Sequence, residues 1–116
     1  MPVIKTPVTR EEFKVYYALR YKVLREPWGH AKGTEKDDYE AISEHFMAVD
    51  EKTGEVLGVI KLYEKAPGVG HVSHMAVSTT HQHKGIGRFL VEAVEKRARE
   101  RGFKTLGAMS RVTATA

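Results

Sequence analysis

The chain has 116 residues, of which 41% are hydrophobic and 29% are charged. That length and balance are those of an ordinary globular protein, and we expect residues 1–116 to form one domain. Cysteine is absent, which excludes disulfides and a thiol nucleophile. The sequence shows no apolar run long enough for a secretion signal or a membrane span, so we expect a cytoplasmic protein that does not bind membranes.

The formal net charge of +4 raises the question of nucleic-acid binding. Against it, the sequence has no stripe of interleaved basic and aromatic residues and no zinc-finger spacing, so we expect no nucleic-acid partner. The basic residues of the C-terminal third could instead attract a polyanionic cofactor, although a solvated helix face explains those from Lys96 onward equally well. They are Lys84, Arg88, Lys96, Arg97, Arg99, Arg101 and Lys104.

The spacing of apolar residues predicts elements in the order β-α-α-β-β-β-α-β. Thr9 and Glu12 form a capping-box pattern that opens the first helix, which should end before Pro27. Gly54 lies in a turn that should join two strands as an antiparallel hairpin, and Gly102 should stop the last helix. The other predicted elements are strands at 3–6, 46–49, 56–63, 71–77 and 103–108, a weaker helical stretch near 35–42, loops at 26–34 and 66–70, and a helix that ends near 101.

The segment from residue 82 to residue 88 carries the most informative pattern in the chain. It joins an apolar strand to an amphipathic helix through Gly85 and Gly87, with Lys84 and Arg88 beside them. A helix start exposes unpaired N–H groups and the positive end of the backbone dipole, and glycine lets an anion approach that backbone closely. The segment therefore predicts a site for a phosphate or pyrophosphate.

Other phosphate-binding motifs fit this segment less well. A dinucleotide-binding fingerprint would need a third glycine where Leu90 stands, and a P-loop would need Gly-Lys followed by serine or threonine. A structural alternative stays open, in which the two glycines only shape a tight turn from strand to helix. In that case Lys84 and Arg88 are solvated surface charges.

The pattern Gln82-x-x-Gly85-x-Gly87, preceded by Met75-Ala76-Val77, resembles the GNAT superfamily of N-acetyltransferases. The predicted order of elements is also the GNAT order, and the resemblance covers almost the entire chain, most weakly before residue 44. It implies an α+β fold in three layers, with a mixed and mostly antiparallel sheet flanked by helices. It also implies transfer of an acetyl group from acetyl-coenzyme A to a primary amine by direct attack in a ternary complex, without a metal.

In that family the glycine loop binds the pyrophosphate of acetyl-coenzyme A, and the preceding strand pairs with its pantetheine arm. Carried over to this chain, the Met75 N–H would polarise the thioester carbonyl. Because the backbone supplies this contact, the Met75 side chain can equally be a core residue. The resemblance implies that the cofactor-binding residues are Met75, Ala76, Val77, Gln82, His83, Lys84, Gly85, Ile86, Gly87 and Arg88.

An attacking amine must lose a proton, and His71 is the first candidate for the base. It lies where several family members carry a glutamate or histidine, and imidazole titrates in the useful range. Strict alternation along the strand would place Ser73, Met75 and Val77 on the face of His71, where Ser73 could relay a proton, and His74 on the opposite face. The alternative for His71 is a half-exposed strand histidine without a catalytic role.

Two further sets of residues invite a functional hypothesis. Glu44 and His45, at the start of a central strand, could line the acceptor pocket. The chain also has six histidines, and the pair His81-x-His83 has the tightest spacing. A zinc site requires three or four ligands, so we expect no metal.

The family typically continues with another helix and two more strands, and residues 110–114 look like the approach to that helix. We therefore expect a truncated or naturally short form, with an unpaired sheet edge that a homodimer would cover. Many family members use a tyrosine of that helix to protonate the leaving thiolate. Here Tyr63 or a residue of a second subunit would have to replace it.

Two other classes of function remain open at this point. A coenzyme A-binding module without catalysis would bind acetyl-coenzyme A but release no thiol. A basic nucleic-acid-binding α/β domain would bind oligonucleotides in a salt-sensitive way and ignore acetyl-coenzyme A. The acceptor, whether a small amine, a peptide or a protein lysine, cannot be read from these residues.

Overall fold

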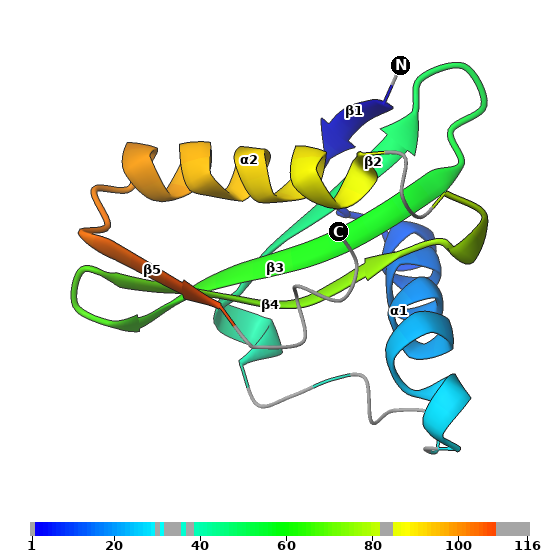
Figure 1. Cartoon of the computed structure of the whole chain (residues 1–116), viewed down its shortest axis with the longest axis horizontal. Helices are drawn as coiled ribbons and strands as arrows, with labels where there is room; N and C mark the ends of the chain where they lie inside the picture. Colours follow the sequence, from blue (N-terminus) through cyan, green and yellow to red (C-terminus); the bar gives the residue numbers. More distant parts are fainter. Residues whose placement is uncertain (1, 30, 32–35, 37–38, 82–84, 109–116) are drawn as a thin grey trace.

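The computed structural model describes residues 2–29, 31, 36, 39–81 and 85–108, and these form three layers (Figure 1). The middle layer is a sheet with the strand order β1-β2-β3-β4-β5. Neighbouring strands are antiparallel except β4 and β5, which are parallel. Helices cover the two faces, so the predicted α+β class with a mixed, mostly antiparallel sheet is confirmed. The elements are β1 Pro2–Lys5, α1 Arg10–Leu24, β2 Glu44–Asp50, β3 Val56–Ala66, β4 Val69–Val77, α2 Ile86–Glu100 and β5 Thr105–Ala108.

The first helix begins at the predicted capping box. The Thr9 hydroxyl accepts a hydrogen bond from the Glu12 N–H at 3.1 Å, and the Glu12 carboxylate accepts one from the Thr9 N–H at 3.0 Å. The ion pair with Lys5 and the hydrogen bond from the Thr9 N–H lower the pKa of the Glu12 carboxylate to about 2. The helix ends at Leu24, before Pro27 as predicted from the sequence. A short 3-10 helix, Glu26–Trp28, follows where a loop was expected.

The second helix ends where Gly102 was expected to stop it. Gly102 has a φ of +76°, and its N–H donates to the carbonyl of Arg99 at 3.0 Å. The N–H of Phe103 donates to the carbonyl of Ala98, also at 3.0 Å, which completes a Schellman ending. The chain then returns directly into β5 beside β4.

Some of the predicted boundaries are wrong. The hairpin of β3 and β4 is longer than its apolar core, because β3 runs to Ala66 and β4 begins at Val69, so the expected loop at 66–70 is a tight turn. Of the weak helical stretch expected near 35–42, the described residues show only a 3-10 turn, Glu40–Ile42. Within the part of the chain that the structure describes, no helix is long and apolar enough to cross a membrane.

The two helices close two different cores. Beneath α2 the core is apolar, whereas beneath α1 a smaller apolar cluster adjoins buried polar side chains. The first cluster consists of Phe46, Ala48, Leu57, Ile60, Leu62, Val72, Met75, Val77, Ile86, Leu90 and Val94. The second consists of Tyr16, Met47, Val49, Val59 and Ala76.

A β-bulge interrupts β4 in the middle of its pairing with β3. Ala76 lies opposite Val59, but three residues earlier Ser73 lies opposite Lys61, only two residues further along β3. One extra residue is therefore inserted in β4, and side chains after it change face. Strict alternation was the wrong expectation, because the Met75 side chain packs in the core beneath α2.

Candidate functional site

The site is built where β4 leads toward α2. Gly85 is the residue before α2 and has a φ of +83°, in the left-handed region that favours glycine. The first intrahelical bond runs from the Phe89 N–H to the Gly85 carbonyl at 3.0 Å, so the N–H groups of residues 86–88 lack a partner within the helix. The first turn of α2 contains no acidic residue, and no side chain caps it. Its local charge therefore favours an anion.

The predicted cofactor loop is only partly described. Gln82, His83 and Lys84 lie outside the described residues. Ile86 and Gly87 are buried in the first turn of α2, and Ile86 belongs to the core beneath that helix. The Arg88 side chain is 85% exposed and pairs with Glu92 at 3.7 Å, which leaves it within reach of a ligand at the helix start.

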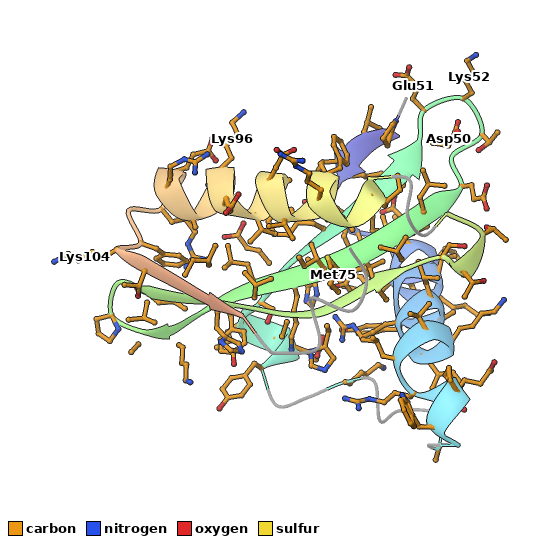
Figure 2. The ribbon with its side chains drawn as sticks, in the orientation of Figure 1. Asp50, Glu51, Lys52, Met75, Lys96 and Lys104 are labelled. Atoms are coloured by element: carbon orange, nitrogen blue, oxygen red, sulfur yellow. The ribbon has the colours of Figure 1, made fainter. Side chains whose placement is uncertain are left out.

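Among the described residues, Met75 has no register partner on either side of β4. On one side, β4 pairs with β5 only from Val69 to Val72, where the described part of β5 ends at Ala108. On the other side, Met75 falls within the bulge and has no register partner in β3. Its side chain is buried beneath α2 and 4% exposed (Figure 2). Because this side chain is buried, a ligand at this point of β4 would contact the backbone of Met75. The resemblance implies the same kind of contact.

His71 lies on the sheet face that α1 covers, between an aromatic ring and a glycine. It pairs in register with Tyr63 on β3 and with Gly107 on β5, and the His71 and Tyr63 rings are 5.3 Å apart. A Cβ at Gly107 would lie 3.8 Å from His71 Nδ1, so the missing side chain leaves space beside the imidazole. Tyr63 in turn stacks on Tyr39 at 4.5 Å. The imidazole is half-buried in a partly aromatic wall.

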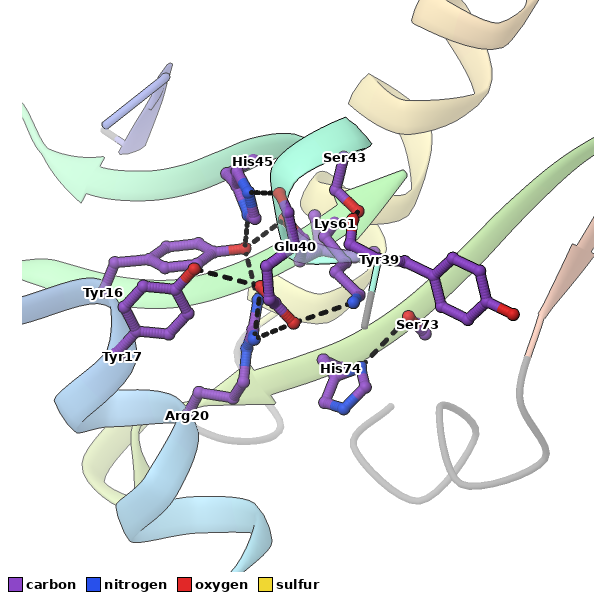
Figure 3. A network of polar contacts seen from close by, with 11 residues as sticks. Tyr16, Tyr17, Arg20, Tyr39, Glu40, Ser43, His45, Lys61, Ser73 and His74 are labelled. Atoms are coloured by element: carbon purple, nitrogen blue, oxygen red, sulfur yellow. Dashed lines mark hydrogen bonds and ion pairs between the residues drawn. The ribbon is translucent and has the colours of Figure 1, made fainter. Parts of the chain in front are cut away.

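Ser73 and His74 follow on the same strand and touch each other. Ser73 is 1% exposed and His74 is 7% exposed, and His74 Nδ1 lies 3.1 Å from Ser73 Oγ (Figure 3). The bulge thus brings the His74 ring beside Ser73, and the expectation that the two side chains point to opposite faces is wrong. The His74 side chain is therefore packed inside the protein.

A buried ionic network adjoins this row of residues (Figure 3). Glu40, on the 3-10 turn before β2, accepts hydrogen bonds from Arg20 of α1 and Lys61 of β3. The Arg20 Nη1 distances to the two carboxylate oxygens are both 3.0 Å, and the Lys61 Nζ distance is 2.9 Å. The Tyr17 hydroxyl also donates to Glu40, at 3.1 Å. Both cations are fully buried, so one carboxylate compensates two charges inside the protein.

His45 and Tyr16 extend the network across the sheet. His45 Nε2 lies 3.0 Å from the Glu40 carbonyl, which can only accept, so Nε2 carries a proton. His45 Nδ1 lies 2.8 Å from the Tyr16 hydroxyl, which also accepts a bond from Arg20. Burial lowers the pKa of His45 and raises the pKa of Tyr16. Burial in the folded protein therefore favours the neutral forms of both side chains.

The register of the strands explains how these groups reach one another. Lys61 lies opposite His45 on β2 and opposite Ser73 on β4, so the three side chains form a row across one face of the sheet. Glu44, the neighbour of His45, instead pairs with Arg97 and Arg101 of the α2 side, each at 2.8 Å. Of the two residues expected to line an acceptor pocket, only His45 lies on the face of His71.

Sequence reasoning missed the network itself. Arg20 and Glu40 have no local pattern that marks them as buried. Lys61 does, because it interrupts the apolar run Val59-Ile60-x-Leu62 and is therefore placed in the middle of a buried strand. A metal is not suggested, since within the described ranges no three histidine, aspartate or glutamate side chains gather where they could hold an ion.

Comparison with solved structures places the fold among acetyltransferases. An IAA acetyltransferase from Bacillus cereus ATCC 14579 superposes with a TM-score of 0.69 at 22% identity, over 91% of this chain and 63% of that chain. The chain thus spans less than two thirds of that protein. A GNAT-family acetyltransferase from Staphylococcus aureus Mu50 gives a TM-score of 0.75 at 13% identity, over 97% of this chain and 76% of that one.

A further structural relative is AAC(6')-Iy, solved in complex with the bisubstrate analog CoA-S-monomethyl-acetylneamine. It gives a TM-score of 0.72 at 16% identity, over 95% of this chain and 80% of that chain. At such identities these structures establish the fold. The sequence model of the acetyltransferase (GNAT) family matches residues 10–115, nearly the whole chain. The chain therefore belongs to the GNAT family of acetyltransferases.

Proposed function

We propose that this protein transfers an acetyl group from acetyl-coenzyme A to a primary amine, by direct attack while both substrates are bound. The observation that carries the proposal is the family match over residues 10–115. The local geometry supports it, because a strand with a bulge at Met75 leads to a helix that starts with glycine. That arrangement suits an extended donor with a pyrophosphate at one end.

Acetyl-coenzyme A would lie along β4 and reach the start of α2. The N–H groups of Ile86, Gly87 and Arg88 supply donors for the pyrophosphate, and the Arg88 side chain adds a positive charge beside them. Gln82, His83 and Lys84 belong to the same proposed loop. Toward the acetyl end the proposed contacts are with the backbone of Met75, Ala76 and Val77.

The chemistry proposed for this chain's own groups needs a donor and a base. When bound, acetyl-coenzyme A supplies an activated acetyl thioester. The Met75 N–H is proposed to donate a hydrogen bond to the thioester oxygen as negative charge develops there. His71 is proposed to accept the proton that the amine loses as its nitrogen bonds to the acetyl carbon and the carbon–sulfur bond breaks. Tyr63, next to His71, is the candidate that protonates the leaving thiolate.

Calorimetry with acetyl-coenzyme A, followed by a thiol-release assay with a panel of aliphatic amines, aromatic amines and lysine peptides, tests the proposal. We expect saturable one-to-one binding and thiol release with at least one amine. Binding without thiol release for any amine would indicate a coenzyme A-binding module instead. If the folded protein ignores acetyl-coenzyme A but binds an oligonucleotide in a salt-sensitive way, a nucleic-acid function takes the place of this one.

Two variants of α2 locate the proposed pyrophosphate site within that experiment. Arg88→Glu places a negative charge in the first turn and should weaken acetyl-coenzyme A binding about tenfold. Lys96→Glu makes the same change in charge on an exposed side chain that points away from the sheet further along α2 (Figure 2). We expect this control to bind within about twofold of the wild type. Equal weakening by both variants would mean that only the overall charge matters.

The role of His71 is tested in the same assay with His71→Gln. We expect the turnover rate at neutral pH to fall about 100-fold, with acetyl-coenzyme A affinity unchanged. The wild-type rate should also rise with pH as an imidazole deprotonates, and the variant should lack that rise. A variant that keeps both the rate and its pH dependence would remove His71 from the mechanism.

A further inference from the structure

His74 has a backbone conformation that histidine rarely adopts. Its φ is +54°, and no other residue except glycine has a positive φ in the part of the chain that the structure describes. In the left-handed region the Cβ comes too close to the following carbonyl oxygen, so residues other than glycine mostly avoid it. Such conformations persist where the surroundings impose them, and they cluster at functional sites. His74 stands in the middle of a strand, so no turn requires it.

The surroundings of His74 show what holds this conformation. The ring is buried, and Nδ1 lies 3.1 Å from the hydroxyl of Ser73, which is itself buried (Figure 3). Ser73 lies opposite Lys61, whose ammonium group is bound to Glu40 at 2.9 Å. The contact between His74 and Ser73 is thus set against the buried row of His45, Lys61 and Ser73.

The consequence of this conformation falls on the next residue. Because His74 is left-handed, β4 gains an extra residue relative to β3, and Met75 leaves the register. The Met75 side chain then packs beneath α2 instead of lying on the face of Ser73. In a strand without the bulge, Met75 would pair with β3, and its N–H would have a different direction.

We propose that the His74 side chain, through its hydrogen bond to Ser73, is a positioning group that holds the β4 bulge and so fixes the direction of the Met75 N–H. The nature of the ligand that this N–H meets rests on the function proposed above. His74 itself takes no proton and touches no substrate in this role. It acts through the backbone of the residue that follows it.

Substitutions at His74 separate the side chain from the backbone conformation. Asparagine tolerates the left-handed region and carries an amide that can bond to Ser73, so His74→Asn should keep the bulge. Alanine offers neither property, so His74→Ala should let β4 relax toward regular pairing. Ser73→Ala removes the hydrogen-bond partner while leaving His74 in place. Thermal melting of each variant shows first that it is folded.

The first readout is the amide NMR signal of Met75 as acetyl-coenzyme A or free coenzyme A is added. In the wild type and in His74→Asn, we expect a shift that depends on the acetyl group. In His74→Ala that difference should be lost, while the signals of residues 85–88 still respond to both ligands. A merely structural role for His74 would change the melting temperature but not this selective loss.

The second readout is turnover with an amine that supports thiol release. We expect kcat to fall about 10- to 100-fold in His74→Ala, because a displaced donor stabilises the reacting oxygen poorly. His74→Asn should stay within threefold of the wild type, and KM for acetyl-coenzyme A should change less than threefold in both. Ser73→Ala should lower kcat at least threefold, and it decides the question if His74→Ala does not fold.

Several outcomes would overturn the proposal. They are a wild type whose Met75 amide does not distinguish acetyl-coenzyme A from coenzyme A, a His74→Asn variant as impaired as His74→Ala, or a folded His74→Ala or Ser73→Ala variant with wild-type kcat. A protein that binds acetyl-coenzyme A without turnover contradicts the enzymatic function alone, because the Met75 signal still tests the role of His74. A folded wild type that does not bind acetyl-coenzyme A overturns both.

Discussion

The sheet face beneath α2 is closed by apolar side chains, whereas the face beneath α1 buries two cations and a histidine around a partly buried carboxylate. Leu90 and Val94 of α2 are fully buried against apolar strand residues. On the other face, Arg20 and Lys61 are equally buried, but they are held by hydrogen bonds to Glu40. The same sheet is thus stabilised by two different kinds of interaction.

The two faces differ in how strictly their contacts fix the positions of the side chains. Apolar contacts are individually weak and non-directional, so a packed core tolerates small changes in shape. A buried ionic network is satisfied only when each donor meets its acceptor, and a partly satisfied network is costly. The network lies on the sheet face of His71, the proposed base, where Lys61 pairs in register with Ser73. We infer that the network fixes the positions of the side chains on this face more narrowly than apolar packing alone would.

The largest effect that separates the two faces is expected at Glu40. Glu40→Gln removes the carboxylate with which two buried cations pair. Breaking a buried ion pair in this way costs about 3–5 kcal/mol. Urea denaturation should therefore show a loss of that size in the free energy of unfolding.

Two further variants control this measurement. Glu44→Gln removes a carboxylate that pairs with Arg97 and Arg101 in a partly exposed position, and it should cost less than about 1 kcal/mol. Adding Lys61→Met to Glu40→Gln removes one of the two buried cations and should restore part of the lost stability. If Glu40→Gln is no more costly than Glu44→Gln, the network does not stabilise the face beneath α1.

The apolar face should respond with a smaller loss. Leu90→Ala leaves a cavity between α2 and the sheet, where Leu90 packs so closely that a Cβ at Gly58 would lie 2.9 Å from its Cδ1. Such substitutions cost about 2–5 kcal/mol, and we expect about 3 kcal/mol by urea denaturation. The exposed Glu95→Ala on the same helix should change stability by less than about 0.5 kcal/mol. A comparable cost for both would contradict close packing beneath α2.

The sequence was a good guide to features set by local chemistry. The capping box of Thr9 and Glu12, the helix end before Pro27 and the helix stop at Gly102 each depend on a few neighbouring residues, and all were predicted. The glycine at the start of α2 was predicted in the same way, and Gly85 has the required positive φ. The end of β3 was not predicted, because pairing with β4 extends the strand beyond its apolar residues to Ala66.

Features that depend on distant contacts were missed. The bulge at His74 changes which face Met75 occupies, and histidine in a strand gives no local signal for a left-handed conformation. Glu40 meets Arg20 and Lys61 only after α1, the 3-10 turn and β3 have assembled. Such residues read as ordinary surface charges until the fold is known. Of these three residues, only Lys61 lies within an apolar run, and that position in the sequence indicates burial.

The smallest expected effect is the pH dependence that His45 gives to the free energy of unfolding. Burial lowers the pKa of His45 below its ordinary value of 6.5, with Arg20 and Lys61 contributing and Glu40 opposing. As pH falls below about 6.5, the unfolded chain binds a proton that the folded chain resists, so the free energy of unfolding should decrease until pH reaches the lowered pKa. One such group contributes at most about 1.4 kcal/mol per pH unit.

Urea denaturation of the wild type and of His45→Gln between pH 5 and pH 7 measures this contribution. Glutamine keeps an amide N–H for the Glu40 carbonyl but cannot titrate, so the difference between the two proteins isolates His45 from the other histidines. We expect the wild type to lose more stability than the variant as pH falls. Parallel curves would mean that the network beneath α1 accepts a charged imidazole. The face beneath α1 would then accommodate a third cation beside Arg20 and Lys61. Its contacts would in that case depend less strictly on charge than the buried network indicates.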